Sequence, residues 1–295
     1  MKPLDISLRD RVWAVPDFTL SEWGEQRSPF ALCVFVLNEG ERIRAQLNRM
    51  RSLTSQIDIV VADGGSNDGA VAPDFLAGQG VRALLTKRGP GRLSAQMRMA
   101  LAYAMKRGYE GVVVMDGNNK DDPEAVPAFV QLLSAGYDHI QGSRYLPGGK
   151  AINTPWSRHL AVKYLHAPLV SLAAGFRYTD TTNGFRAYSR RLLLDERVAP
   201  FREVFSGYEL HYYLAIRAAR LGFNVCETPV TRAYPPGKTP TKIRGLRGNL
   251  LILRTLLRAC RHRYNPPECL RDHHGKHGKH GKKTRGRTTS TSIPS

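Results

Sequence analysis

Two short acidic segments carry the side chains best suited to chemistry in this sequence. Asp63 opens the segment DGGSNDG and Asp116 opens the segment DGNNKDDP, and each follows a run of apolar residues. A carboxylate at the end of a strand can accept hydrogen bonds from a nucleotide base or ribose, whereas an acidic loop can hold a divalent metal ion against phosphate oxygens. Asp-Gly clusters are also typical of ordinary turns. Because both segments close a buried strand of what should be one sheet, they favour a nucleotide site.

A basic turn supplies charge of the opposite sign. Residues 89–92 read GPGR and open a helical pattern directly after two cations. Backbone N–H groups at the start of a helix, together with nearby cations, attract phosphate. The turn does not match the P-loop pattern, and by itself it is equally typical of a helix start with solvated charges. Taken with the acidic loops, it adds four residues to the predicted nucleotide site: Lys87, Arg88, Gly91 and Arg92.

Four further polar residues matter if the nucleotide carries a group for transfer. A phosphorylated acceptor needs cations, and arginine binds phosphate through two parallel hydrogen bonds. Arg144 and Arg158 offer such groups, although two surface arginines would look the same in the sequence. A hydroxyl acceptor needs a base beside it, for which Glu209 and Asp180 are the candidates. Glu209 lies in a helical pattern, where pairing with a neighbouring arginine explains it equally well.

The cysteines predict neither a zinc site nor a disulfide framework. The four cysteines show no C-x-x-C spacing, and Cys33 lies within an apolar run. Five of residues 2–11 are charged (Lys2, Asp5, Arg9, Asp10 and Arg11), unlike a signal peptide. No uninterrupted apolar run reaches the roughly 18 residues of a spanning helix. We therefore expect a cytoplasmic protein that, where it meets a membrane, lies on the cytoplasmic face.

The elements that must position these side chains alternate between strands and helices. Short apolar runs predict buried strands at residues 30–37, 57–62, 81–85 and 112–115, with a late strand at 224–230. Helical spacing follows at residues 41–53, 93–104, 125–133 and 208–221. Alternating strands and helices form right-handed units around a parallel sheet, whose ligands bind at the carboxyl ends of the strands. Both acidic segments fall at those ends.

The charge of +19 points to a polyanionic partner, and the C-terminal region suggests which one. Between residues 246 and 261, leucines share one helical face and arginines form the neighbouring stripe, as in a helix that lies in a membrane interface. Residues 273–295 contain an H-G-K repeat and a Thr/Ser-rich end with little to bury, which is typical of disorder. We therefore predict an N-terminal extension at 1–29, a catalytic domain at 30–240, a basic amphipathic helix at 241–265 and a disordered basic tail at 266–295.

A series of segments in fixed order carries a family resemblance. Over residues 30–245 the chain reads FVLNEGERI, VVADGGSNDG, KRGPGRLSAQ, VVVMDGNNKDDPE, QGSRYLPGG, TDTTNGFRAYS and ETPVTRAYP. This collinear order resembles the family 2 glycosyltransferases, particularly their dolichol-phosphate mannosyltransferase-like branch. The resemblance implies a GT-A (Rossmann-like) α/β fold with a mostly parallel central sheet flanked by helices.

The resemblance also implies roles for single residues. Asp63 would bind the nucleotide base, and Asp116 would serve a metal ion and the diphosphate. Arg144 and Arg158 would hold an acceptor phosphate. The predicted site is completed by four neighbours in the same segments, namely Asn38, Glu39, Gly117 and Asn118.

The acidic loop departs from the family pattern in a way that bears on the metal. The second acid of the family's D-x-D motif is Asn118 here, and the usual glutamine two positions later is Lys120. We expect Mn²⁺ or Mg²⁺ at Asp116 and Asn118, with a relaxed requirement because the Lys120 cation could supply part of the charge. Asp121 and Asp122 are substitutes only out of register.

The sequence thus predicts an inverting glycosyltransferase that moves a sugar from a nucleotide donor to a polyprenyl phosphate at an anionic membrane surface. One alternative is transfer to a glycan hydroxyl, which would depend on Glu209 or Asp180. A sugar nucleotidylyltransferase would need a glycine-rich phosphate loop after the first strand, where residues 38–41 read NEGE. A nucleic-acid-binding protein would explain the charge, but the acidic strand ends and the lack of a recognised binding motif count against it.

Overall fold

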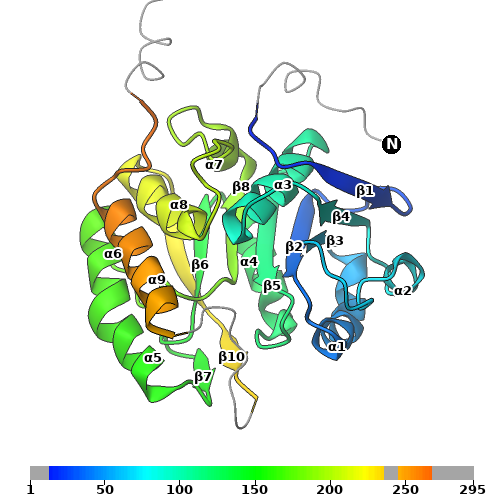
Figure 1. Cartoon of the computed structure of the whole chain (residues 1–295), viewed down its shortest axis with the longest axis horizontal. Coiled ribbons are helices and arrows are strands. Elements are labelled where there is room, and N and C mark those ends of the chain that lie inside the picture. The colour runs from blue at the N-terminus through cyan, green and yellow to red at the C-terminus, as the bar shows by residue number, and fades with distance from the viewer. Residues whose placement is uncertain (1–12, 236–244, 268–295) are drawn as a thin grey trace, which may run out of the picture.

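The computed structural model describes residues 13–235 and 245–267, and these form a sheet with helices on both faces (Figure 1). The sheet has eight strands in the order β1-β4-β3-β2-β5-β8-β6-β9. Their bounds are β1 Phe18–Glu22, β2 Phe30–Val36, β3 Asp58–Asp63, β4 Ala83–Lys87, β5 Gly111–Asp116, β6 His139–Ser143, β8 Arg186–Ser189 and β9 Val225–Pro229. Only β1 and β8 run antiparallel to their neighbours, so the predicted mostly parallel sheet is confirmed.

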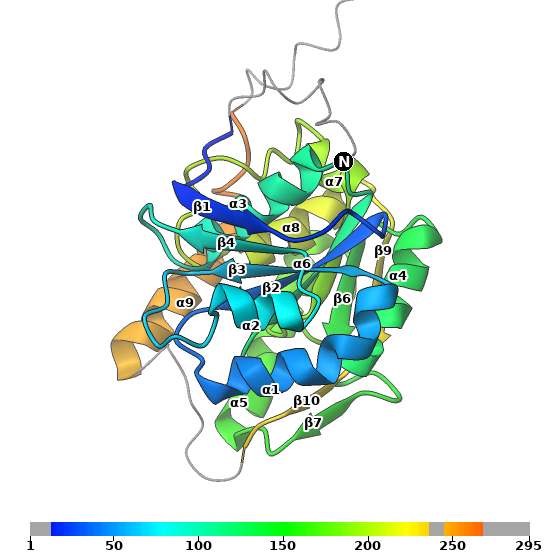
Figure 2. The same cartoon turned by 90° about the vertical axis from the view of Figure 1, so that its right-hand side faces the viewer.

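Two helical layers cover the sheet because its central strands are apolar on both faces. Residues one apart in a strand point to opposite faces, and in β2 Cys33 packs with one cluster while Val34 packs with the other. The first layer contains α3 Leu93–Lys106, α6 Ala167–Ala174, α7 Arg190–Leu194, α8 Glu209–Arg220 and α9 Gly245–Cys260. The second contains α1 Glu41–Met50, α2 Pro73–Gly78 and α4 Val126–Ser134 (Figure 2).

Several elements were not predicted from the sequence. The strand β1 lies inside the segment that we separated as an N-terminal extension, and it pairs along its whole length with the edge strand β4. The antiparallel β8 is inserted between β5 and β6. A small second sheet pairs β7 Lys150–Ile152 with β10 Thr231–Ala233. This second sheet brings the end of the catalytic domain close to the loop that follows β5.

The C-terminal basic segment forms a helix where the leucine and arginine pattern predicted one. The helix α9 lies against α6 and α8, with Leu256 and Ala259 buried in the core that these helices share. Leu250 on its outer side is exposed. Within residues 13–235 and 245–267, no helix is both long and apolar enough to cross a bilayer. The predicted disordered tail lies almost entirely outside the described residues.

Candidate functional site

The sheet brings the two acidic loops to one edge. Strand β2 pairs on one side with β3 and on the other with β5, opposing Val36 to Asp63 and Phe35 to Asp116. With about 4.8 Å between neighbouring strands, the two carboxylate-bearing residues lie roughly 10 Å apart. Asp63 is buried, and its carboxylate accepts hydrogen bonds from the backbone N–H of Ser66 at 3.0 Å and from its hydroxyl at 2.5 Å. Asp63 and Asp116 therefore lie at the same edge of the sheet, as predicted.

The loop after β2 is tied to the loop after β3. The Asn38 N–H donates to Ser66 Oγ at 2.9 Å, and Asn38 Oδ1 accepts from the Asn67 N–H at 2.9 Å. Gly40 N–H donates to Asp68 Oδ2 at 2.8 Å. Glu39 forms an ion pair with Arg42 at 2.7 Å. The structure thus gathers the predicted residues Asn38, Glu39 and Asp63.

The basic turn lies beside the same loops because β4 pairs with β3. A Cβ atom on Gly65 would lie 3.3 Å from the Lys87 carbonyl, and the Lys87 ammonium donates to the Gly89 carbonyl at 2.7 Å. Gly91 has φ +101°, and a Cβ there would lie 2.5 Å from Ala95 Cβ, so only glycine fits this turn into α3. Arg88 is fixed through its backbone to Asp17, and the Arg92 guanidinium lies 5.9 Å from the Tyr208 ring centre.

The loop after β5 is held by a residue that the sequence analysis missed. Gln46 of α1 donates to the Asp116 carbonyl at 3.0 Å and accepts from the Asn119 N–H at 2.7 Å. Gly117 has no space for a side chain, because its Cβ would lie 2.8 Å from Val36 Cγ2. These contacts fix the position of Asp116 at the end of β5.

A second missed residue, Arg232 of β10, binds two acids of this loop. Its Nη2 donates to Asp116 Oδ2 at 3.0 Å, and its Nη1 donates to Asp121 Oδ2. The backbone reinforces this contact, since Asp121 and Arg232 form an isolated antiparallel bridge and the Ala233 N–H donates to the Lys120 carbonyl at 2.8 Å. Arg232 therefore lies between the two carboxylates.

The residues present do not fit the predicted metal site. Asn118 turns its amide nitrogen toward Asp116 Oδ2, at 3.4 Å, while its oxygen accepts from the Lys120 N–H. A metal ligand would have to be the oxygen. Arg232 already uses one oxygen of Asp116 and one of Asp121, while the second Asp121 oxygen is buried without a hydrogen-bond partner. In the described part of the chain, no group of three or more His, Cys, Asp or Glu side chains is arranged to hold a metal ion.

Arg144 and Asp180 form a buried ion pair. Arg144 Nε and Nη2 donate to the two carboxylate oxygens of Asp180 at 2.6 and 2.9 Å, and Nη2 also donates to Thr182 Oγ1 at 2.7 Å. Burial would raise the pKa of Asp180, but the charge and hydrogen bonds of Arg144 outweigh this and lower it. Glu227, another missed residue, accepts from the N–H groups of Thr179 and Asp180 at 2.8 and 3.1 Å and so holds this loop.

Three cations surround the ring of Tyr234. The Lys120 ammonium lies 5.0 Å from the ring centre, and the guanidinium carbons of Arg158 and Arg232 lie 5.4 and 5.8 Å from it. Arg158 also donates to the Tyr234 hydroxyl at 2.7 Å. Burial would raise the pKa of Tyr234, but the charges of Arg232 and Arg158 lower it. This set, which we call the Tyr234 cluster (Lys120, Arg158, Arg232 and Tyr234), makes a positive region beside Asp116.

Glu209 has contacts of a different kind. Its carboxylate accepts from the Gly207 N–H at 2.7 Å at the start of α8, and its charge also acts on Arg98. Gly207 in turn accepts from the Ser94 N–H, so Glu209 lies near the start of α3. That end of α3 carries the predicted Gly91 and Arg92.

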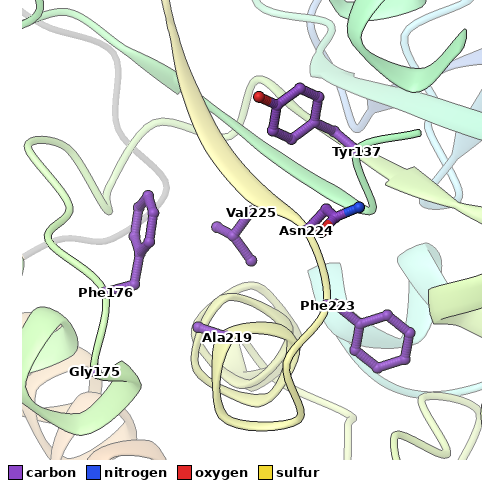
Figure 3. A pocket seen from close by; sticks show the side chains of 7 residues that line it. All are labelled: Tyr137, Gly175, Phe176, Ala219, Phe223, Asn224 and Val225. Atoms are coloured by element: carbon purple, nitrogen blue, oxygen red, sulfur yellow. The ribbon is translucent and has the colours of Figure 1, made fainter. Parts of the chain in front are cut away.

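A pocket of about 260 Å³ lies elsewhere, beside β9 (Figure 3). It is lined by Tyr137, Gly175, Phe176, Ala219, Phe223, Asn224 and Val225. Val225 begins β9, which runs parallel to β6. The pocket therefore lies toward the amino ends of the strands, away from the acidic loops, and ligands of parallel sheets bind at the opposite edge.

A mostly parallel sheet with acidic loops at its carboxyl edge and cations beside them is the arrangement expected of a nucleotide-binding transferase with the GT-A fold. Residues 31–196 match the model of the family described as glycosyl transferase family 2, and the chain belongs to that family. The family resemblance inferred from the collinear motifs is thereby confirmed, and its branch is confirmed by the names of the relatives that the chain matches.

Two curated relatives carry related names. The chain is 31% identical over 197 residues to the polyprenol monophosphomannose synthase of Mycolicibacterium smegmatis, covering 66% of this chain and 73% of that one. It is 29% identical over 197 residues to the undecaprenyl-phosphate mannosyltransferase of Micrococcus luteus, covering 66% of this chain and 79% of the relative.

The fold is also found among solved structures. The glucosyl-3-phosphoglycerate synthase of Mycobacterium tuberculosis, in complex with Mn²⁺, UDP and its product, superposes with a TM-score of 0.55 at 19% identity over 78% of this chain and 79% of that one. The same synthase has been crystallised with Mg²⁺ and UDP, with a TM-score of 0.54. At this identity the likeness establishes the GT-A-like fold alone.

Proposed function

We propose that this glycosyltransferase moves a sugar from a nucleotide donor to a polyprenyl phosphate, with inversion at the anomeric carbon. The observation that carries the proposal is the Tyr234 cluster, which gathers cations beside Asp116 at the carboxyl edge of the sheet. The names of the two mannosyltransferase relatives support a lipid-phosphate acceptor. The nucleotide would lie across Asp63, residues 87–92 and Asp116.

In this reaction an oxygen of the acceptor phosphate attacks the anomeric carbon and forms a new C–O bond. The bond from that carbon to the donor diphosphate breaks, and the nucleoside diphosphate leaves with the electron pair. An acceptor phosphate monoester has a second pKa of about 6 and is largely ionised near neutral pH, so no strong base is required. The protein's task is to position two anions and to neutralise the charge that grows on the diphosphate.

Arg158 is the residue to which we assign the acceptor phosphate. Its guanidinium belongs to the Tyr234 cluster and donates a hydrogen bond to the Tyr234 hydroxyl. Arg144 has a more constrained task, because Nε and Nη2 are both directed at Asp180. We assign Arg144, whose side chain is only 1% exposed, to the same phosphate as a fixed buried charge, and we assign Asp180 to positioning Arg144. A carboxylate whose pKa is lowered by an arginine is a weak base, which counts against Asp180 in a hydroxyl-acceptor mechanism.

The membrane contact that we propose lies on α9 and its neighbours. Trp156 of α5 Trp156–Ala161, Leu172 of α6 and Leu250 of α9 are among the most exposed large apolar side chains, at 72, 79 and 66%. A groove of about 560 Å³ on α9 is lined by Leu250, Leu253, Leu257 and four arginines, Arg254, Arg258, Arg261 and Arg263. Apolar side chains flanked by arginine suit an anionic bilayer. We call Trp156, Leu172 and the α9 groove the lipid-facing surface.

The test of the transfer is a panel of UDP-, GDP- and dTDP-sugars with polyprenyl phosphate in detergent. We expect one donor to give a lipid-linked sugar, and Arg158→Ala to lower the rate at least about tenfold by removing a charged hydrogen-bond donor. Arg197→Ala, which breaks an exposed pair with Asp195, is the matched control and should keep the rate. Transfer to a glycan hydroxyl instead, lost in Glu209→Gln and kept in Arg158→Ala, would overturn the lipid-phosphate acceptor.

A further inference from the structure

The position of Arg232 bears on how the donor diphosphate is neutralised, an inference that rests on the proposed function. One guanidinium spans Asp116 and Asp121, with Nη2 3.0 Å from Asp116 Oδ2 and Nη1 on Asp121 Oδ2. A divalent cation in a two-acid site makes the same bridge between two carboxylates. The guanidinium therefore bridges these two acids in the way that a metal ion between them would, and it occupies one oxygen of Asp116, a predicted metal ligand.

The contact is built into the fold. Asp121 and Arg232 are both buried, and their backbones form an antiparallel bridge. On either side of the bridge, the Asp122 N–H donates to the Thr231 carbonyl at 3.0 Å and the Ala233 N–H donates to the Lys120 carbonyl at 2.8 Å. A side chain held by this many backbone contacts is a fixed part of the site.

The charges balance as they would with a metal ion. Asp116 and Asp121 contribute two negative charges, and Arg232 and Lys120 contribute two positive charges, equal to one divalent cation. Burial and, after it, the charge of Arg232 lower the pKa of Lys120. The positive charge of this position is set by geometry, since Lys120, Arg158 and Arg232 all lie around the Tyr234 ring. Arg158 adds a third cation beside the same ring. The local charge is therefore positive, so that an added dication would be repelled and an anionic diphosphate would be attracted.

We infer that Arg232 and Lys120 replace the divalent cation of this site, so that the chain binds its nucleotide diphosphate without a metal ion. Arg232 is held by the two acids, and the Lys120 ammonium lies next to it over the Tyr234 ring. Asn118, in the position of the second acid of D-x-D, donates to Asp116 and contributes no negative charge. Asn118, Lys120 and Arg232 thus contribute together to the replacement of the divalent cation.

The test measures binding of UDP and GDP by calorimetry, with EDTA or with Mn²⁺, and of Mn²⁺ alone by electron paramagnetic resonance. We expect the wild-type chain to bind a nucleotide equally well with EDTA and with Mn²⁺. Arg232→Met should weaken that binding at least about tenfold in EDTA, because a charged hydrogen-bond donor is lost. The double variant Asp121→Asn with Arg232→Met leaves no buried carboxylate without a partner and should show the same loss if the single variant does not fold.

A reverse variant tests the same inference by gain of function. Asn118→Asp with Arg232→Met frees Asp116 and restores the second acid, so it should bind Mn²⁺, which the wild-type chain should not. Arg49→Met is the matched control, because Arg49 pairs with Asp122 of the same loop at 2.8 Å on the exposed side, and its nucleotide affinity should equal that of the wild type.

The outcomes separate the inference from the proposed function. Nucleotide binding by the wild-type chain that requires Mn²⁺ overturns the replacement of the metal and leaves the glycosyltransferase proposal standing. Binding in EDTA that Arg232→Met and the double variant leave unchanged also overturns it. Binding of neither nucleotide, with or without metal, overturns both.

Discussion

The buried pair of Arg144 and Asp180 gives the first prediction at the scale of single residues. Both side chains are almost fully buried and joined through two hydrogen bonds. Asp180→Asn keeps the shape but leaves the arginine charge unpaired, and breaking a buried pair typically costs about 3–5 kcal/mol of unfolding free energy. We expect a loss of this size in urea unfolding at pH 7, together with loss of sugar transfer.

The matching control is Asp195→Asn. Asp195 pairs with Arg197 at 2.7 Å, but the arginine side chain is about half exposed, so the loss should stay below about 1 kcal/mol. The pH dependence has a definite sign as well. Because the pKa of Asp180 is lowered in the folded state, its contribution is present above the ordinary aspartate pKa of about 3.9 and is lost as the pH falls through the folded-state value. Equal losses in the two variants would contradict the special role of the buried pair.

The helix α9 carries the prediction at the scale of elements. We expect the protein to sediment with vesicles that contain anionic lipid, and to do so less at high salt because the arginines act partly through charge. Leu250→Ser removes exposed apolar surface from α9 without touching the core, so vesicle binding should fall severalfold while the melting temperature is kept.

The control for α9 is Leu20→Ser on the edge strand β1, where the side chain is 40% exposed. This change removes the same side chain from a different surface. If both substitutions weaken vesicle binding equally, the binding does not depend on the lipid-facing surface.

Strands made of apolar residues could be predicted from the sequence, whereas strands that bury polar side chains could not. The strands β2, β3 and β5 are apolar runs, and their positions followed directly from the sequence. The strand β6 reads HIQGS and is fully buried, with Gln141 donating to the Asn183 carbonyl at 3.2 Å. In β8, Arg186 is buried and donates to the His211 and Thr181 carbonyls. Neither strand has an apolar pattern, and the polar side chains that the two strands bury bond partly to other segments of the chain, although Gln141 Oε1 and His139 Nε2 have no partner.

The residues of the candidate site also fall into those that could be predicted from the sequence and those that could not. Asp63 and Asp116 were predictable because each ends an apolar strand, and neighbouring parallel strands bring their ends together. Arg232 was not, since its partner Asp121 lies 111 residues earlier and the contact exists only once β10 reaches the loop after β5. The segment ETPVTRAYP contributed to the family resemblance, but no sequence signal distinguished Arg232 and Tyr234 from other residues in it.

At the scale of the whole molecule, one cluster of buried polar groups joins the sheet to the helical layer of α6 and α8. His139 of β6 is completely buried, close to the rings of Tyr178 and Tyr188 and to the charge of Arg186. The Tyr178 hydroxyl lies 3.5 Å from His139 Nδ1 and donates to the Ala215 carbonyl of α8 at 2.9 Å. His211 of α8 contacts the Tyr188 hydroxyl at 3.1 Å. The packing of the sheet against this helical layer therefore depends on His139 remaining neutral.

Burial and, secondarily, the charge of Arg186 lower the pKa of His139 from 6.5 to about 3. The unfolded chain takes up a proton below pH 6.5 and the folded chain does not, so the stabilisation is complete above 6.5 and is lost as the pH falls toward 3. At about 1.4 kcal/mol for each pH unit, His139 alone should contribute a loss of about 2 kcal/mol between pH 6.5 and 5, measured by urea unfolding. His211, whose pKa is also lowered by burial and by Arg186, adds to this loss. His139→Gln should reduce the slope of the unfolding free energy against pH by the equivalent of about one proton. Tyr178→Phe should lower the unfolding free energy at every pH and keep that slope. An unchanged slope in His139→Gln would show that His139 is not the group that couples protonation to the packing of the two layers.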